Sequence, residues 1–174
     1  RNSRRPSRGR RGFGSRRNTS RGPKKENIHP SKFIQSARSV EAAVYEPKHV
    51  FRDFHVTEAL QRNIEKKGFT TPSPIQDQTI APALEGRDVI GIANTGTGKT
   101  LAFALPILNK LLTERRSHAL IIAPTRELAE QILHECETFF RGEKLFHALL
   151  IGGTSMNRQF RDLSRRPRLV IGTP

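Results

Sequence analysis

The sequence has few of the features that mark secreted or membrane proteins. Its 174 residues contain a single cysteine, Cys136, which cannot form an internal disulfide. No apolar run approaches the roughly 18 residues that a membrane span needs, and the first residues lack the apolar core of a secretory signal peptide. We therefore expect a cytoplasmic protein without a membrane partner. The chain starts at Arg1 rather than Met and stops at Pro174 directly after a strand-like run, so we expect a fragment of a longer protein.

Acidic residues are almost absent from the N-terminal part of the chain. Residues 1–38 contain 13 Lys or Arg against one acid, whereas the other 136 residues contain 18 against 15. With so few apolar residues this Arg/Gly-rich part cannot form a core, so we predict a disordered basic tail over residues 1–38. Such tails bind single-stranded nucleic acid through charge and stacking, although a solvated run of charge is the alternative. Residues 39–50 are predicted to be a transition segment.

Apolar runs alternate with amphipathic segments over residues 51–174. The expected strands are 89–93, 119–123, 146–151 and 168–173, and the expected helices are 58–67, 74–84, 101–112, 128–140 and 155–163. This alternation predicts an α/β fold with a doubly wound parallel sheet. Such sheets bind ligands at the carboxyl ends of their strands, which is where the unusual turns of this sequence fall.

The most informative turn follows the expected strand 89–93. A loop of small residues, Asn94 to Gly98, leads into Lys99-Thr100 and an apolar helix. Backbone N–H groups and the helix dipole in such a loop form a phosphate cradle, in which Lys99 would reach the outer phosphates and the Thr100 hydroxyl would hold Mg²⁺. Ala93 stands where the general pattern has Gly, and an ordinary strand-to-helix turn is the alternative.

A second pattern lies just upstream. Ser73-Pro74-Ile75-Gln76 is typical of a helix start, with Ser as the cap and Pro at the first helical position. Gln76 can therefore simply close a capping box.

Taken together, the motifs stand in the order found in DEAD-box RNA helicases, and residues 50–174 are identified as a member of that family by resemblance. The matching segments are 68–76 (Q motif, with Phe51 at the spacing of its upstream aromatic), 93–100 (motif I, where Ala is the usual first residue), 124–129 (motif Ia), Gly152-Gly153 (glycine doublet) and Thr173-Pro174 (opening of motif Ib). The resemblance implies that residues 51–174 are the first RecA-like ATP-binding domain, truncated at motif Ib.

The resemblance also implies a site for ATP with Mg²⁺. Lys99 and Thr100 would be catalytic, Gln76 would pair with the adenine edge, and Phe51 would stack on the base. Core packing is the alternative for Phe51, and helix capping is the alternative for Gln76. The implied nucleotide contacts are Phe51, Phe69, Gln76, Ala93, Asn94, Thr95, Gly96, Thr97, Gly98, Lys99 and Thr100.

An RNA track is implied along the same edge of the sheet, through contacts that do not depend on sequence. Arg126 could instead form an ion pair with Glu127 or Glu130, and the glycine doublet could only make a tight turn. The implied RNA contacts are Pro124, Thr125, Arg126, Gly152, Gly153 and Thr173.

The implied function is an ATP-dependent RNA helicase that couples hydrolysis to local duplex unwinding, with a second RecA-like domain in the full-length chain. The family's Walker B carboxylates and arginine fingers would lie beyond residue 174, so residues 1–174 alone are expected to be inactive. Two rivals stay open. One is another P-loop enzyme, such as a DNA helicase or a nucleotide kinase, and the other is a non-enzymatic RNA-binding or annealing protein whose basic tail is the active part.

Overall fold

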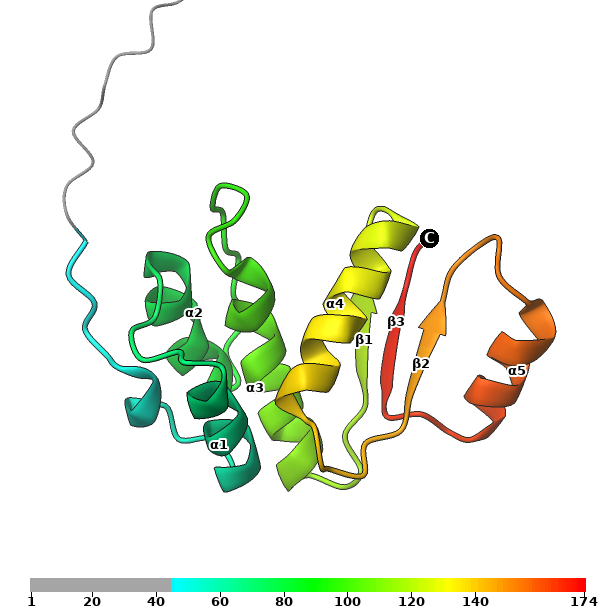
Figure 1. Ribbon diagram of the computed structural model, residues 1–174, viewed down its shortest axis with the longest axis horizontal. Helices are drawn as coiled ribbons and strands as arrows, with labels where there is room; N and C mark the ends of the chain where they lie inside the picture. The colour runs from blue at the N-terminus through cyan, green and yellow to red at the C-terminus, as the bar shows by residue number, and fades with distance from the viewer. Residues whose placement is uncertain (1–44) are drawn as a thin grey trace, which may run out of the picture. The chain divides into compact units, whose positions relative to one another are not determined.

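The computed structural model describes residues 45–174, so the predicted tail and residues 39–44 of the transition segment lie outside the described residues. None of the helices within that range is long and apolar enough to cross a membrane. The elements are, in order, the 3₁₀ helix η2 (Phe51–Asp53), α1 (Glu58–Lys66), α2 (Pro74–Leu84), α3 (Lys99–Thr113), β1 (Ala119–Ile122), α4 (Arg126–Phe139), β2 (His147–Leu150), α5 (Met156–Ser164) and β3 (Leu169–Gly172) (Figure 1).

The three strands form one parallel sheet in the order β1-β3-β2, in which Ile121 pairs with Ile171 and Ile171 with Leu149. After β1 the chain forms β2 two positions away in the sheet, and β3 then fills the position between them. Because crossovers between parallel strands are right-handed, this reversal puts α4 and α5 on opposite faces of the sheet. The predicted α/β fold with a doubly wound parallel sheet is confirmed.

The core lies between the sheet and the helices on one of its faces. Ile121 and Ile171 are buried there, while α2 packs along α3 and α3 packs against α4. On the opposite face α5 packs beside β2, but Leu120 and Ile122 of β1 are 64% and 65% exposed. The fully buried aliphatic side chains are Leu60, Ile64, Ile80, Leu105, Leu108, Leu111, Leu169 and Ile171.

The strand predicted over residues 89–93 is not formed, and this prediction is wrong for the described structure. These residues have no regular secondary structure, and Ile90 and Ile92 are 94% and 92% exposed. A strand of a parallel sheet obtains its backbone hydrogen bonds only from neighbouring strands. None of the three strands within residues 45–174 pairs with this run, so its apolar side chains stay in contact with solvent.

Candidate functional site

The phosphate-loop sequence forms a compact loop at the start of α3. Figure 1 shows this loop on the same edge of the molecule as the start of α4 and the C-terminal end of β3. Gly98 caps α3 with φ of 80°, in the left-handed region that side chains disfavour. A Cβ atom at Gly98 would collide with the amide nitrogen of Gln76, so glycine is required here for two reasons.

Lys99 folds back over the loop that precedes it. Its Nζ donates to the carbonyl oxygens of Ala93 at 2.5 Å and Asn94 at 2.6 Å. The Thr97 hydroxyl also donates to the Asn94 carbonyl, at 2.8 Å. The cation that the motif assigns to phosphate oxygens is therefore bound to backbone oxygens of its own loop.

Gln76 is 5% exposed and uses both ends of its amide within the protein. Its Oε1 accepts from the backbone N–H of Ser73 at 2.9 Å, which is the capping contact expected from the sequence. Its Nε2 donates to the carbonyl oxygen of Gly98 at 3.0 Å. Gln76 thus caps α2 and also ties this helix to the phosphate loop, while its contact with adenine stays a prediction.

Phe51 is 1% exposed and packs against Phe54 and Phe69, with ring centroids 5.9 Å apart in both pairs. The core packing considered from the sequence is thus what this structure shows for Phe51. Phe69 is 39% exposed. Both rings line an open cavity of about 480 Å³, together with Val50, Arg52, Glu65 and Thr70. Of the two rings only Phe69 exposes part of its surface, beside α1, and stacking on a base stays a prediction.

On the other side of the same edge, the structure brings Arg126 and the glycine doublet together. The guanidinium lies against the backbone of Gly152 and Gly153, so that a Cβ atom at Gly152 would come within 3.3 Å of Nη2. Gly153 has φ of 80°, and a side chain there would also meet the guanidinium. Within residues 45–174 Arg126 forms no ion pair with Glu127 or Glu130, so the ion-pair alternative for Arg126 is wrong for this structure.

The neighbouring predicted RNA contacts lie around this pair. Thr125 caps α4 by accepting from the Leu128 N–H at 3.3 Å, and Pro124 is exposed beside it. The N–H of Thr173 donates to the Leu150 carbonyl oxygen at 3.1 Å, at the end of β3. Residues from β1, β2 and β3 therefore converge on one rim.

Two residues that support these loops were not identified from the sequence. The Ser73 hydroxyl donates to the Thr97 carbonyl oxygen at 2.7 Å. Gln159 of α5 donates to the Ile151 carbonyl at 2.9 Å and to the Thr154 hydroxyl at 2.7 Å, on either side of the glycine doublet. The sequence marked Ser73 only as the cap of its helix and gave no signal for its bond to Thr97, 24 residues away, and Gln159 carried no signal at all.

The donor set of the loop fits a triphosphate. The 15-residue helix α3 directs its N-terminal N–H groups at the loop and has no acidic residue in its first turn. Lys99 is the first residue of that helix and Thr100 the second, so residues with an ammonium and a hydroxyl occupy the positive end of the dipole. These are the groups that phosphate oxygens and their Mg²⁺ require.

Comparison with known proteins gives the same assignment. The family model of DEAD/DEAH box helicases matches residues 73–174. An ATP-dependent rRNA helicase of Encephalitozoon cuniculi is 46% identical over 71% of this chain and 31% of its own length. A second ATP-dependent rRNA helicase, from Aspergillus terreus, is 41% identical over 91% of this chain and 34% of its own length. A DEAD-box ATP-dependent RNA helicase of Bacillus cereus is 42% identical over 71% of this chain and 24% of its own length.

A solved structure is similar as well. The crystal structure of a DEAD box protein from Methanococcus jannaschii aligns with a TM-score of 0.65 and 32% identity, over 72% of this chain and 35% of that one. The chain thus spans about a third or less of the length of the relatives that it matches. With its phosphate loop, its Arg126–glycine contact and these matches, the chain belongs to the DEAD/DEAH box helicase family.

Proposed function

We propose that this chain supplies the first RecA-like domain of an ATP-dependent RNA helicase, which couples ATP hydrolysis to local separation of RNA strands. The observation that carries the proposal is the placement of two donor groups on one rim. Lys99 stands at the N-terminus of α3, and Arg126 stands at the N-terminus of α4 against the glycine doublet. ATP and an RNA strand could therefore bind side by side on one edge of the fold.

On the nucleotide side, Lys99 would exchange the carbonyl oxygens of Ala93 and Asn94 for phosphate oxygens, which are stronger acceptors because they are charged. Thr100 would hold Mg²⁺, which neutralises charge on the phosphates. Gln76 would exchange one of its two internal partners for the adenine edge, and Phe51 with Phe69 would offer an aromatic wall to the base.

On the RNA side, Arg126 and Thr125 would contact the phosphate backbone, and the glycine doublet would let the strand approach closely. Arg126 is suited to this role because a cation at a helix N-terminus opposes the dipole, and an anion would offset that cost. The basic residues of the tail would add contacts that do not depend on sequence. We further propose a cytoplasmic location, which rests on the single cysteine.

The match covers only about a third of the length of these relatives, so we propose that hydrolysis needs groups outside residues 1–174. Carboxylates for Mg²⁺ and the attacking water, and arginines of a second domain, are the groups that phosphoryl transfer requires. Residues 1–174 alone are then expected to bind ATP weakly and not to hydrolyse it.

The test is ATP hydrolysis by the full-length protein with no nucleic acid, with single-stranded RNA and with DNA of the same sequence. The proposal predicts stimulation by RNA well above that by DNA. Equal stimulation by DNA would favour another P-loop enzyme. RNA binding that ignores ATP, without hydrolysis, would favour the non-enzymatic alternative.

A further inference from the structure

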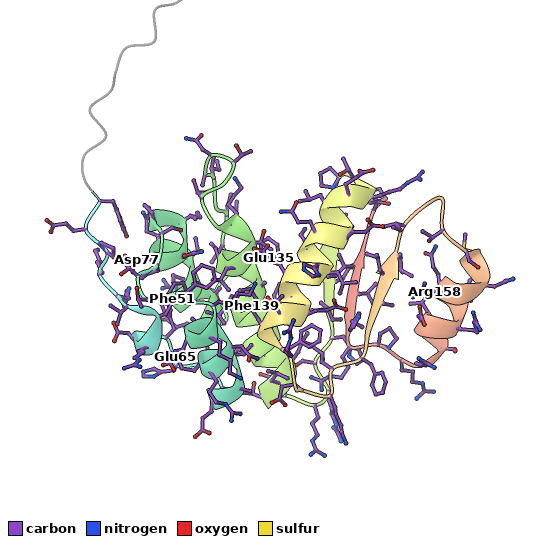
Figure 2. The ribbon with its side chains drawn as sticks, in the orientation of Figure 1. Phe51, Glu65, Asp77, Glu135, Phe139 and Arg158 are labelled. Carbon is purple, nitrogen blue, oxygen red and sulfur yellow. The ribbon has the colours of Figure 1, made fainter. Side chains whose placement is uncertain are left out.

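Asp77 is a buried carboxylate that neither proposed binding role uses. It follows Gln76 on α2, and its side chain is 1% exposed. Oδ2 accepts from the Tyr45 hydroxyl at 2.5 Å and from the Lys48 N–H at 2.9 Å. Oδ1 accepts from the His49 N–H at 3.1 Å and is hydrogen bonded to His49 Nδ1 at 2.6 Å. All four partners belong to residues 45–49, and Figure 2 shows Asp77 facing that segment.

Burial of a lone carboxylate is costly, and here the hydrogen bonds offset it. Desolvation by itself raises the pKa of Asp77, but the bonds from Tyr45, Lys48 and His49 together outweigh it and leave the pKa below its ordinary value. The side chain is therefore ionised at neutral pH. Hydrogen bonds to an ionised acceptor are stronger than neutral ones, so residues 45–49 are held firmly on α2.

The anchored segment leads directly to Val50 and Phe51, which line the cavity beside α1. The Val50 N–H donates to Asp53 Oδ2 at 2.8 Å, and the Phe51 N–H donates to the Thr70 carbonyl oxygen at 3.1 Å. Val50, Phe51 and Thr70 all line the cavity of about 480 Å³. Asp77 thus fixes on α2 the residues that come directly before Val50 and Phe51.

Gln76 and Asp77 are neighbours on α2, but their side chains contact different parts of the protein. The Gln76 amide reaches the phosphate loop through the Gly98 carbonyl oxygen, and the Asp77 carboxylate holds the segment before Phe51. Two adjacent residues of α2 therefore contact the phosphate loop and the segment that precedes Phe51. A nucleotide whose phosphates bind the loop and whose base meets Phe51 fits only if the loop and Phe51 keep their relative positions.

We propose that Asp77 is a positioning residue for nucleotide binding: by anchoring residues 45–49 on α2 it holds Phe51 where the purine base of ATP binds. The inference rests on the proposed ATP site and adds to it a residue that acts through others. Asp77 itself touches neither the base nor the phosphates.

The test is steady-state ATP hydrolysis by the full-length protein carrying Asp77→Asn, which keeps the shape of the side chain and removes its charge. Loss of charged hydrogen bonds is expected to raise the KM for ATP about tenfold. Because the groups that act on the phosphates are untouched, kcat is expected to stay at the wild-type value. The preference for ATP over GTP is expected to fall, since the wall no longer holds the base in register.

Two further variants keep the result interpretable. Tyr45→Phe removes one hydrogen bond at a partly exposed site without disturbing the core, and is expected to raise the KM for ATP by a smaller factor in the same direction. Glu85→Gln, at the exposed C-terminal end of the same helix, removes a carboxylate paired only with Arg87. It is expected to leave KM, kcat and the ATP preference unchanged.

A lower melting temperature in Asp77→Asn with an unchanged KM and ATP preference would overturn the positioning role, because Asp77 would then only stabilise the fold. A KM for ATP equal to that of the wild-type protein in both Tyr45→Phe and Asp77→Asn would also overturn the positioning role. If the wild-type protein fails to bind ATP, the proposed function falls and this inference falls with it. If the wild-type protein binds ATP and the Asp77 and Tyr45 variants bind it equally well, only the positioning role of Asp77 is overturned.

Discussion

Lys99 and Gln76, on the proposed nucleotide side of the rim, donate to backbone carbonyl oxygens of the phosphate loop. Arg126, on the proposed RNA side, forms no ion pair within residues 45–174. The nucleotide side thus satisfies its own donors, and a ligand must replace those contacts. The RNA side presents a cation beside bare backbone. We infer that nucleotide binding would require the phosphate loop to rearrange, whereas Arg126 would not have to give up an ion pair to bind RNA. The two sides should therefore respond separately to substitution.

The largest effect is expected from Lys99→Ala. Removing a donor that stabilises charge in phosphoryl transfer costs at least about 100-fold in rate, so RNA-stimulated ATP hydrolysis by the full-length protein should fall by that factor. RNA binding without nucleotide should stay unchanged, because Lys99 lies on the other side of the rim. Lys110→Ala, exposed on the same helix, is the matched control. A Lys99→Ala enzyme that keeps a substantial fraction of the rate would contradict the assignment of the loop.

Removal of residues 1–38 is expected to have the next largest effect, and only on the RNA side. Thirteen Lys or Arg would be lost, so RNA affinity at low salt should fall by more than about tenfold. The plot of log affinity against log salt concentration should flatten by several units of slope, equally for RNAs of different sequence. ATP binding without RNA should not change. An unchanged salt slope would show that the tail is a solvated charge run.

Arg126→Ala tests the RNA side at a single residue. Loss of one phosphate contact should weaken RNA binding by about fivefold to tenfold and lower the salt slope by about one. Arg115→Ala, exposed in the loop before β1 at the opposite end of the strand, should leave both quantities unchanged. If Arg126→Ala instead altered ATP binding measured without RNA, the separation of the two sides would be lost.

The smallest expected effect is on the pH dependence of the stability of the fold, through Cys136 on α4. Burial, with the charge of Glu135 adding to it, raises the pKa of the Cys136 thiol on α4 to about 12. In the unfolded chain a thiol titrates near pH ~8.5. Its contribution to stability is therefore complete below that pH and is lost as pH rises toward the folded value. Between pH ~8.5 and ~9.5 the wild-type protein should lose roughly 1 kcal/mol more than Cys136→Ala.

Urea unfolding of both proteins across this range measures the difference. Cys136→Ala should start from a lower stability, because a buried side chain is shortened, but its stability should fall less steeply with pH. Parallel pH curves for the two proteins would contradict the burial of the thiol.

The sequence predicted the local features of this fold better than its distant contacts. Apolar periodicity located the helices and three strands, and the helix-start pattern predicted the bond between Gln76 and the Ser73 N–H. The strand predicted over residues 89–93 was wrong, because a strand needs neighbouring strands to pair with and hydropathy does not report them.

The site was predicted in part for the same reason. The rule that strand ends share one edge predicted that the turns of Arg126 and of the glycine doublet lie on one rim, but not that the guanidinium packs against the two glycines. The bond from Gln76 to Gly98 spans 22 residues, and the contacts of Asp77 with residues 45–49 span 28 or more. No local pattern indicates which backbone group such a side chain will reach. A polar residue beside a predicted nucleotide contact, on the inner face of its helix, is the only signal that Asp77 offered.

The central claim is that ATP bound on one side of the rim drives separation of RNA strands bound on the other. Its most direct test is the release of a short labelled RNA strand from a duplex by the full-length protein, with ATP, without nucleotide, and with ATP for Lys99→Ala. The account predicts release only by the wild-type protein with ATP. Equal release without nucleotide, or by Lys99→Ala, would contradict it.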